Sequence, residues 1–111
     1  MTEEVGFEEG SDNVFADLGL PDAAERLTKA DLAMRIAEAI RAKRLTQAKT
    51  AALLGIDQPK VSRLLRGQLS GFSTDRLMQF LTLLGQDVTI VVTPARRLTQ
   101  GRVSVVSEVR V

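Results

Sequence analysis

The spacing of apolar residues predicts a mainly α-helical chain. From residue 21 to residue 84 apolar positions recur every three or four residues, which is the period of an α-helix, and Leu32, Ile36 and Ile40 form the clearest stripe. Their apolar faces are expected to close one core. The pattern predicts helices over about 21–43, 47–54, 58–66 and 74–84.

The most informative part of this pattern is the pair of short central helices with the turn between them. Thr46 and Asp57 are suited to cap the two helices. Ala51 is small enough to lie where they cross, and Gly55 tolerates positive φ in the turn. The buried seam is then formed by Leu54, Ile56, Val61 and Leu64. The polar residues that can point outward to a partner are Gln47, Gln58, Lys60, Ser62, Arg63 and Arg66.

The chain before the first long helix is acidic. Residues 1–10 lack an apolar period and cannot bury enough surface to fold alone. Asn13 can cap a single helical turn that places Val14, Phe15 and Leu18 on one apolar face. Two alternatives remain: these side chains pack on the core of their own chain, or they bind another protein.

The C-terminal part has the composition of β-strands. Val88–Val92 is a β-branched run after the turn signal of Gly85–Asp87, so a short strand is predicted. A single strand needs a partner, which the same chain or a second copy could provide. Residues 94–100 are basic and turn-like. Residues 102–111 are a second strand, an exposed tail, or an extension without a role.

Charge is distributed unevenly along the chain. Residues 1–25 contain eight acidic and no basic residues, so the rest of the chain carries +9, because the net charge is +1. Residues 41–66 contain seven basic residues and one acid, Asp57, which makes the two short helices the electropositive centre. The chain has no Trp or Tyr to stack on single-stranded bases. We therefore expect the partner to be a DNA duplex.

Composition also narrows the functional classes. Without Cys or His the chain lacks disulfides, thiolate or imidazole catalysis, and the usual transition-metal ligands. We expect no enzymatic activity, no cofactor and no metal. The acidic N-terminus does not resemble a signal peptide, and no apolar run approaches membrane-spanning length, so we expect a cytoplasmic protein.

At this point a resemblance to a known family becomes specific. Thr46-Gln47, Ala51, Gly55, Ile56, Val61 and Leu64 have the spacing of the Xre-type, phage-repressor-like helix-turn-helix. With GSDNVFADLGLPDA before it and LSGFSTDRLMQFLTLLGQDVTIVV after it, the chain resembles HigA-type antitoxins over roughly residues 10–97. Thr50 departs from the family pattern, which usually has an apolar residue there.

The resemblance implies a fold and an order of domains. The fold is mainly α, a five-helix-type helix-turn-helix domain with a short C-terminal β-strand or hairpin and a flexible acidic N-terminal arm. The arm is expected over residues 1–20, with its short amphipathic turn. The helix-turn-helix domain then covers residues 21–93, followed by a basic linker and possible extra strand over residues 94–111.

The resemblance also assigns roles on DNA. Gln47 matches the glutamine that holds the DNA backbone, while the start of the second short helix reads bases. Mapped by position, Gln58 would contact adenine and Arg63 or Lys60 guanine. Ser62 would touch phosphate or base, Pro59 at most a thymine methyl, and Lys49 and Arg66 add charge towards phosphates. The competing interpretation is structural: Gln58 caps its helix, Lys60 and Arg66 are solvated, and Arg63 pairs with Asp57 or Asp75.

In function, the resemblance implies a DNA-binding antitoxin that neutralises a RelE/HigB-like ribonuclease toxin and represses its own operon at a palindromic operator. Val14, Phe15 and Leu18 would bind the toxin, and acidic charge suits a basic partner. Val88, Ile90 and Val92 would form the interface of a homodimer. The alternative is a stand-alone Xre-family transcriptional repressor without a toxin partner.

Overall fold

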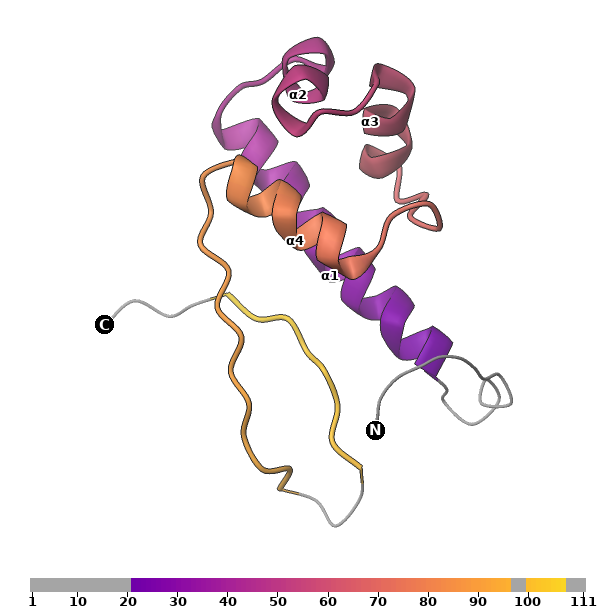
Figure 1. Ribbon diagram of the computed structural model, residues 1–111, viewed down its shortest axis with the longest axis vertical. Coiled ribbons are helices and arrows are strands. Elements are labelled where there is room, and N and C mark those ends of the chain that lie inside the picture. The colour runs from indigo at the N-terminus through magenta and orange to yellow at the C-terminus, as the bar shows by residue number, and fades with distance from the viewer. Residues whose placement is uncertain (1–20, 97–99, 108–111) are drawn as a thin grey trace.

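The computed structural model describes residues 21–96 and 100–107 of the chain, and its ordered elements there are four α-helices (Figure 1). The predicted helix positions are confirmed to within one or two residues. None of these helices is long and apolar enough to cross a membrane. Their bounds are α1 Pro21–Ala42, α2 Gln47–Leu54, α3 Gln58–Leu65 and α4 Thr74–Leu83.

Local hydrogen bonds set where α2, α3 and α4 begin. The Thr46 hydroxyl accepts the Lys49 N–H at 3.1 Å, and the Asp57 carboxylate accepts the Lys60 N–H at 2.9 Å. Ser73 caps α4 in the same way, accepting the Arg76 N–H at 3.1 Å. Each cap satisfies a backbone donor that the helix itself leaves free. These starting points are encoded in a few neighbouring residues, which is why they were predictable.

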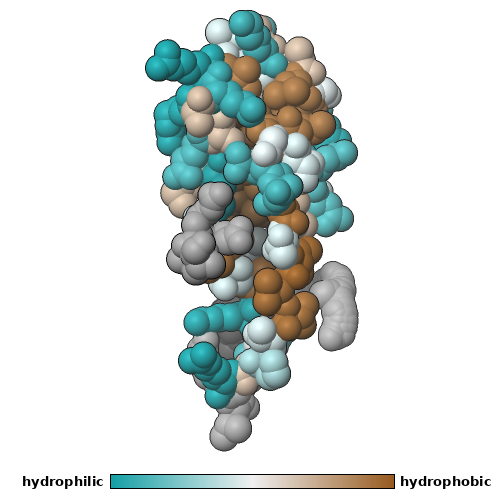
Figure 2. Space-filling view, turned by 90° about the vertical axis from the view of Figure 1, so that its left-hand side faces the viewer, coloured by the Kyte–Doolittle hydropathy of each residue, from teal (hydrophilic) through white to brown (hydrophobic). Residues whose placement is uncertain are grey.

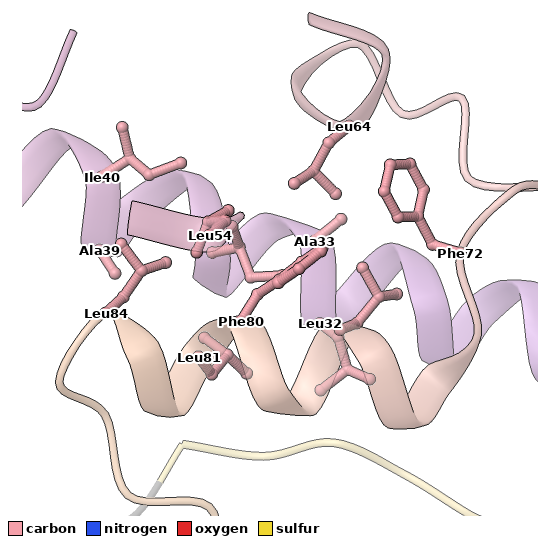
Figure 3. Packing of buried hydrophobic residues seen from close by; sticks show 12 residues of the cluster. Leu32, Ala33, Ala39, Ile40, Leu54, Leu64, Phe72, Phe80, Leu81 and Leu84 are labelled. Carbon is pink, nitrogen blue, oxygen red and sulfur yellow. The ribbon is translucent and has the colours of Figure 1, made fainter. Parts of the chain in front are cut away.

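The core lies between α1, α4 and the α2–α3 pair. α1 and α4 lie side by side and run in the same direction, with α2 and α3 placed across them (Figure 1). In Figure 3 the aliphatic side chains of α1 and α4 meet Leu54 of α2 and Leu64 of α3. Phe72 packs edge-on against Phe80, with 6.0 Å between ring centroids. The residues predicted to form the stripe and the seam are buried, except Ile56, which is partly exposed. The expectation that the other apolar residues of the first helix are also core is wrong for Leu27 and Met34, which are exposed.

Thr50 shows how the chain accommodates its departure from the family pattern. Its side chain is buried, with only 1% exposed. The hydroxyl donates a 2.8 Å hydrogen bond to the carbonyl oxygen of Thr46, one turn earlier in α2. This bond offsets the free-energy cost of burying a hydroxyl, so a polar residue fits a position that would otherwise require an apolar one.

The expected C-terminal strand or hairpin is wrong for the described residues. After Gly85 the chain continues through an extended outgoing segment, residues 86–96, and comes back through a returning segment, residues 100–107 (Figure 1). No backbone hydrogen bond joins the two segments. β-Branched residues favour an extended backbone, but a strand also needs a hydrogen-bonded neighbour, and composition does not provide one.

The expectation of a five-helix-type domain is also wrong, because the described part of the chain has four helices. Beyond Gly85 the Val88–Val92 run and Pro94 offer no helical apolar period, so nothing extends the bundle there. The predicted single turn with Val14, Phe15 and Leu18 lies outside the described residues.

The two C-terminal segments differ in how they meet the helices. Val105 of the returning segment packs against the core, and the Ser107 hydroxyl accepts a 3.2 Å hydrogen bond from the Arg35 guanidinium of α1. The outgoing segment is solvent-facing: Ile90 and Val92 are 72% and 87% exposed. Figure 2 shows hydrophobic side chains, in brown, on the surface of the lower part of the molecule, into which these segments extend.

Candidate nucleic-acid interface

The turn between α2 and α3 fixes the direction in which α3 points. Gly55 adopts φ of 72°, and its N–H and that of Ile56 both donate to the carbonyl oxygen of Ala51, at 2.9 and 3.1 Å. Ala51 is buried at the crossing of the helices. Val61 and Leu64 turn the inner face of α3 into the core. The turn and the core packing together hold the opposite face of α3 towards solvent, and they form a rigid support for it.

The outward face of α3 carries the residues that were predicted to read DNA. Gln58, Pro59, Lys60, Arg63 and Arg66 are exposed, and Ser62 is half-buried. Six side chains of one short segment are thus placed together, as the sequence predicted.

Two of the alternative structural roles, those of Gln58 and Arg63, are not seen, whereas the exposure of Lys60 and Arg66 fits both contact with DNA and simple solvation. Asp57, not Gln58, provides the capping oxygen for α3. Within the described residues the only ion pair joins Lys29 and Glu25 at 3.8 Å, so Arg63 is not paired with Asp57 or Asp75. The polar groups of the α3 face remain available to an external partner.

α2 adds a second set of polar groups. Gln47 is the first residue of α2 and Lys49 lies in the same turn, and both are exposed. The start of a helix has free backbone N–H groups and a partial positive charge, which favour phosphate. Gln47 and Lys49 are therefore suited to hold a phosphate.

The exposed charges of residues 41–66 favour a polyanion as partner. The seven basic residues between 41 and 66 are all exposed, and Asp57, the one acid among them, is engaged at the start of α3. In the described residues no three His, Cys, Asp or Glu side chains are grouped to hold a metal ion. The arrangement supports binding by charge and hydrogen bonds.

The structure adds Arg76 to this surface, a residue that the sequence analysis did not single out. A hollow of about 310 Å³ lies beside α3 and is lined by Ile56, Lys60, Phe72, Ser73 and Arg76, among others. The Arg76 guanidinium lies 5.2 Å from the centre of the Phe80 ring, which helps to hold it at the surface.

A signal for Arg76 was present in the sequence. It is a basic residue in the first turn of a helix, where the helix dipole disfavours positive charge. The apolar period of this helix indicated a core element and gave no role to its exposed residues. Arg76 adds a positive charge to the hollow beside α3 that Lys60 also lines.

The other residues with predicted binding roles are not part of this surface. Val14, Phe15 and Leu18 lie outside the described residues. Val88, Ile90 and Val92 are exposed on the outgoing segment, separate from the α2–α3 face. Their predicted roles stay predictions.

Comparisons with known proteins agree with this geometry. The family model described as a helix-turn-helix domain matches residues 14–93. A solved structure provisionally named as an XRE-family transcriptional regulator is 49% identical to the chain, with a TM-score of 0.75. The match covers 79% of this chain and all of that one. The comparison with curated proteins gave no match.

Proposed function

Because the chain belongs to the XRE family of helix-turn-helix proteins, we propose that it is a DNA-binding transcriptional repressor that also neutralises a RelE-like ribonuclease toxin. The observation that carries the DNA-binding part is the outward face of α3, whose polar and basic side chains are exposed and unpaired within the described residues. Such a face is suited to the major groove, which admits one α-helix and presents donors and acceptors to it.

In this proposal the residues divide between positioning and reading. Gln58 contacts adenine, Lys60 and Arg63 contact guanine, and Pro59 meets a thymine methyl. Gln47, Lys49, Ser62 and Arg66 hold phosphates and so fix the register of α3 on the duplex. Gln47 and Lys49 project from the start of α2, and the other proposed contacts project from α3 and its C-cap, Arg66, which supports this division without testing it.

The size of α3 supports a dimer. Its 8 residues span only about 12 Å, enough to meet a few base pairs, so specificity requires a second copy about one helical turn of DNA away. We propose that the second copy covers the exposed apolar side chains of the outgoing segment, Val88, Ile90 and Val92. Light scattering at micromolar concentration should give twice the monomer mass, and Ile90→Lys should lower it. A monomer that binds a palindromic operator normally would contradict this proposal.

The antitoxin part of the proposal rests on the first 20 residues. They contain six acidic and no basic residues, together with Val14, Phe15 and Leu18. Opposite charge speeds association with a basic toxin, and apolar anchors slow dissociation. A segment of this composition is suited to order itself on a partner.

Two experiments test these parts separately. Fluorescence anisotropy with the DNA upstream of the coding sequence should show specific binding that weakens steeply with salt. If a neighbouring reading frame encodes a small basic protein, deletion of residues 1–20 should abolish neutralisation of that protein and leave DNA binding intact. Unchanged neutralisation by the truncated chain would show that residues 1–20 are a passive tail. The absence of such a reading frame would favour the alternative, a stand-alone repressor without a toxin partner.

A further inference from the structure

An apolar groove lies between α1 and the C-terminal end of α3, and it borders the outward face of α3 at Arg66. On α1 it is formed by a stripe that includes Ala30, Met34 and Ala37, and on α3 and the following loop by Leu65, Arg66 and Leu69. Its volume is about 310 Å³, whereas a cavity of about 150 Å³ already accepts a benzene ring. This α1–α3 groove has room for two large apolar side chains.

The groove is open although its walls are apolar. Met34 is 51% exposed and Leu65 is 37% exposed, and Leu27 continues the stripe one turn before Ala30 with 69% exposure. Leu27, Ala30, Met34 and Ala37 follow one another at spacings of three, four and three residues, so they share one face of α1. A face of this kind loses exposed apolar area when another segment covers it, which favours docking.

The length of chain before α1 matches the position of the groove. Met34 lies about 20 Å along α1 from Pro21, at 1.5 Å per helical residue. Phe15 precedes Pro21 by six residues, which also span about 20 Å when extended. Leu18 and Leu27 lie about 10 Å from Pro21 by the same measures. If the chain turns back at Gly19–Pro21, Phe15 falls beside Met34 and Leu18 beside Leu27.

Charge also favours the acidic N-terminal segment, residues 1–20, as the part of the chain that covers the groove. Arg66 lines the groove, and Arg26 and Arg41 are exposed on α1 at the two ends of its stripe. The acids of this part of α1, Asp31 and Glu38, lie on the flank of the helix turned away from α3. Residues 1–20, with six acidic and no basic residues, are therefore attracted to the side of the stripe nearest α3.

We infer that the chain's own residues 14–18 occupy the α1–α3 groove when no partner is bound, with Phe15 and Leu18 as the buried groups. The acidic residues around them then neutralise Arg66. Because Arg66 is also a phosphate contact in the proposed function, the docked segment lowers DNA affinity, and a partner that removes the segment raises it. This second step rests on the proposed function, whereas docking itself does not.

Tryptophan fluorescence tests the docking directly, because the chain has no Trp or Tyr. Phe15→Trp in the full chain should emit at shorter wavelength and be less accessible to a soluble quencher than Phe7→Trp, which places the probe in the same acidic segment outside the docked residues. Adding Met34→Glu to the Phe15→Trp variant should return its emission to that of an exposed probe. Adding Leu83→Glu instead, at a similarly exposed apolar position on α4, should leave the emission unchanged.

Each outcome of this experiment decides one part of the inference. Equal emission from the two tryptophan variants, or an emission insensitive to Met34→Glu, would overturn docking. A shift that appears only as the protein concentration rises would show that a second copy, and not the chain's own segment, fills the groove. For the regulatory step, Phe15→Ser with Leu18→Ser should raise DNA affinity by about fivefold or more, within the usual range of coupling between sites. Docking with unchanged DNA affinity would overturn that step alone.

Discussion

The α2–α3 unit and the outgoing C-terminal segment differ in whether their backbone groups are paired and their apolar side chains are buried within the chain. In the α2–α3 unit, Thr46, Asp57 and Gly55 pair backbone groups at the helix ends. Its apolar side chains are buried in the core. In the outgoing segment, residues 86–96, no backbone group beyond Gln86 forms a hydrogen bond to the described part of the chain. Its side chains at Ile90 and Val92 are largely exposed.

This difference indicates which region is complete in one chain. The α2–α3 unit is held in shape by its own caps and by packing on α1 and α4 of the same chain, so its outward side chains can be specialised for a ligand. The outgoing segment leaves both apolar surface and backbone groups free, and these are the features that a second chain covers. Stability should therefore depend on the first region, and assembly on the second.

The largest expected effect is on the free energy of unfolding, which should fall when a core residue of the α2–α3 unit is truncated and not when a residue of the outgoing segment is. Leu64→Ala should lower the free energy of unfolding by about 2 to 5 kcal/mol, because Leu64 is 2% exposed in the core and its loss leaves a cavity. Ile90→Ala, at a 72% exposed position, should change it by less than about 0.5 kcal/mol. Urea denaturation at a protein concentration low enough to exclude dimers measures both. A large loss for Ile90→Ala would mean that the outgoing segment is part of the folded core.

The next effect tests the turn that aims α3. Gly55→Ala should cost about 1 to 2 kcal/mol because Gly55 has a φ of 72°, which is unfavourable for residues with a Cβ. No atom lies within 4 Å of the added Cβ, so the cost comes from the backbone alone. Gly71→Ala is the matched control: its surroundings are equally open, but its φ is ordinary, and it should be neutral or slightly stabilising. Equal thermal stabilities of the two variants would contradict this account of the turn.

A smaller effect of opposite sign is expected where α1 ends. Arg44 has φ of 54°, and the hydrogen bonds from Arg44 to Arg41 and from Leu45 to Ile40 close the helix in the arrangement that usually contains Gly. Arg44→Gly should therefore stabilise the fold by about 0.5 to 1 kcal/mol. A fall in melting temperature would show that the Arg44 side chain contributes more than its backbone costs.

The sequence predicted the helices and the α3 face because the signals for them are local. Asp57 starts α3, Gly55 allows the turn, and the period of Val61 and Leu64 determines which side is buried. Those few residues also determine the opposite side, so the positions of Gln58 and Arg63 followed from the same pattern. A polar residue at position 50 did not disturb the prediction, since its hydroxyl bonds within α2.

The features that could not be predicted depend on contacts far apart in sequence. A β-branched run such as Val88–Val92 predicts an extended backbone but not its pairing, and the expected strand is absent from the described chain. Arg76 joins the α3 surface only because the loop after α3 brings α4 beside Lys60. The hydrogen bond between Arg35 and Ser107 spans 72 residues, and no local pattern marks it.

The most direct test of the central claim, that α3 reads base pairs from a rigid support, compares Arg63→Ala with Lys49→Ala on operator and on random duplex DNA. Arg63→Ala should lose roughly 1 to 3 kcal/mol on the operator and relax the preference at one base pair, with a smaller loss on random DNA. Lys49→Ala should weaken both duplexes alike, as expected for a phosphate contact. Equal losses on operator and random DNA for Arg63→Ala would contradict base reading by α3.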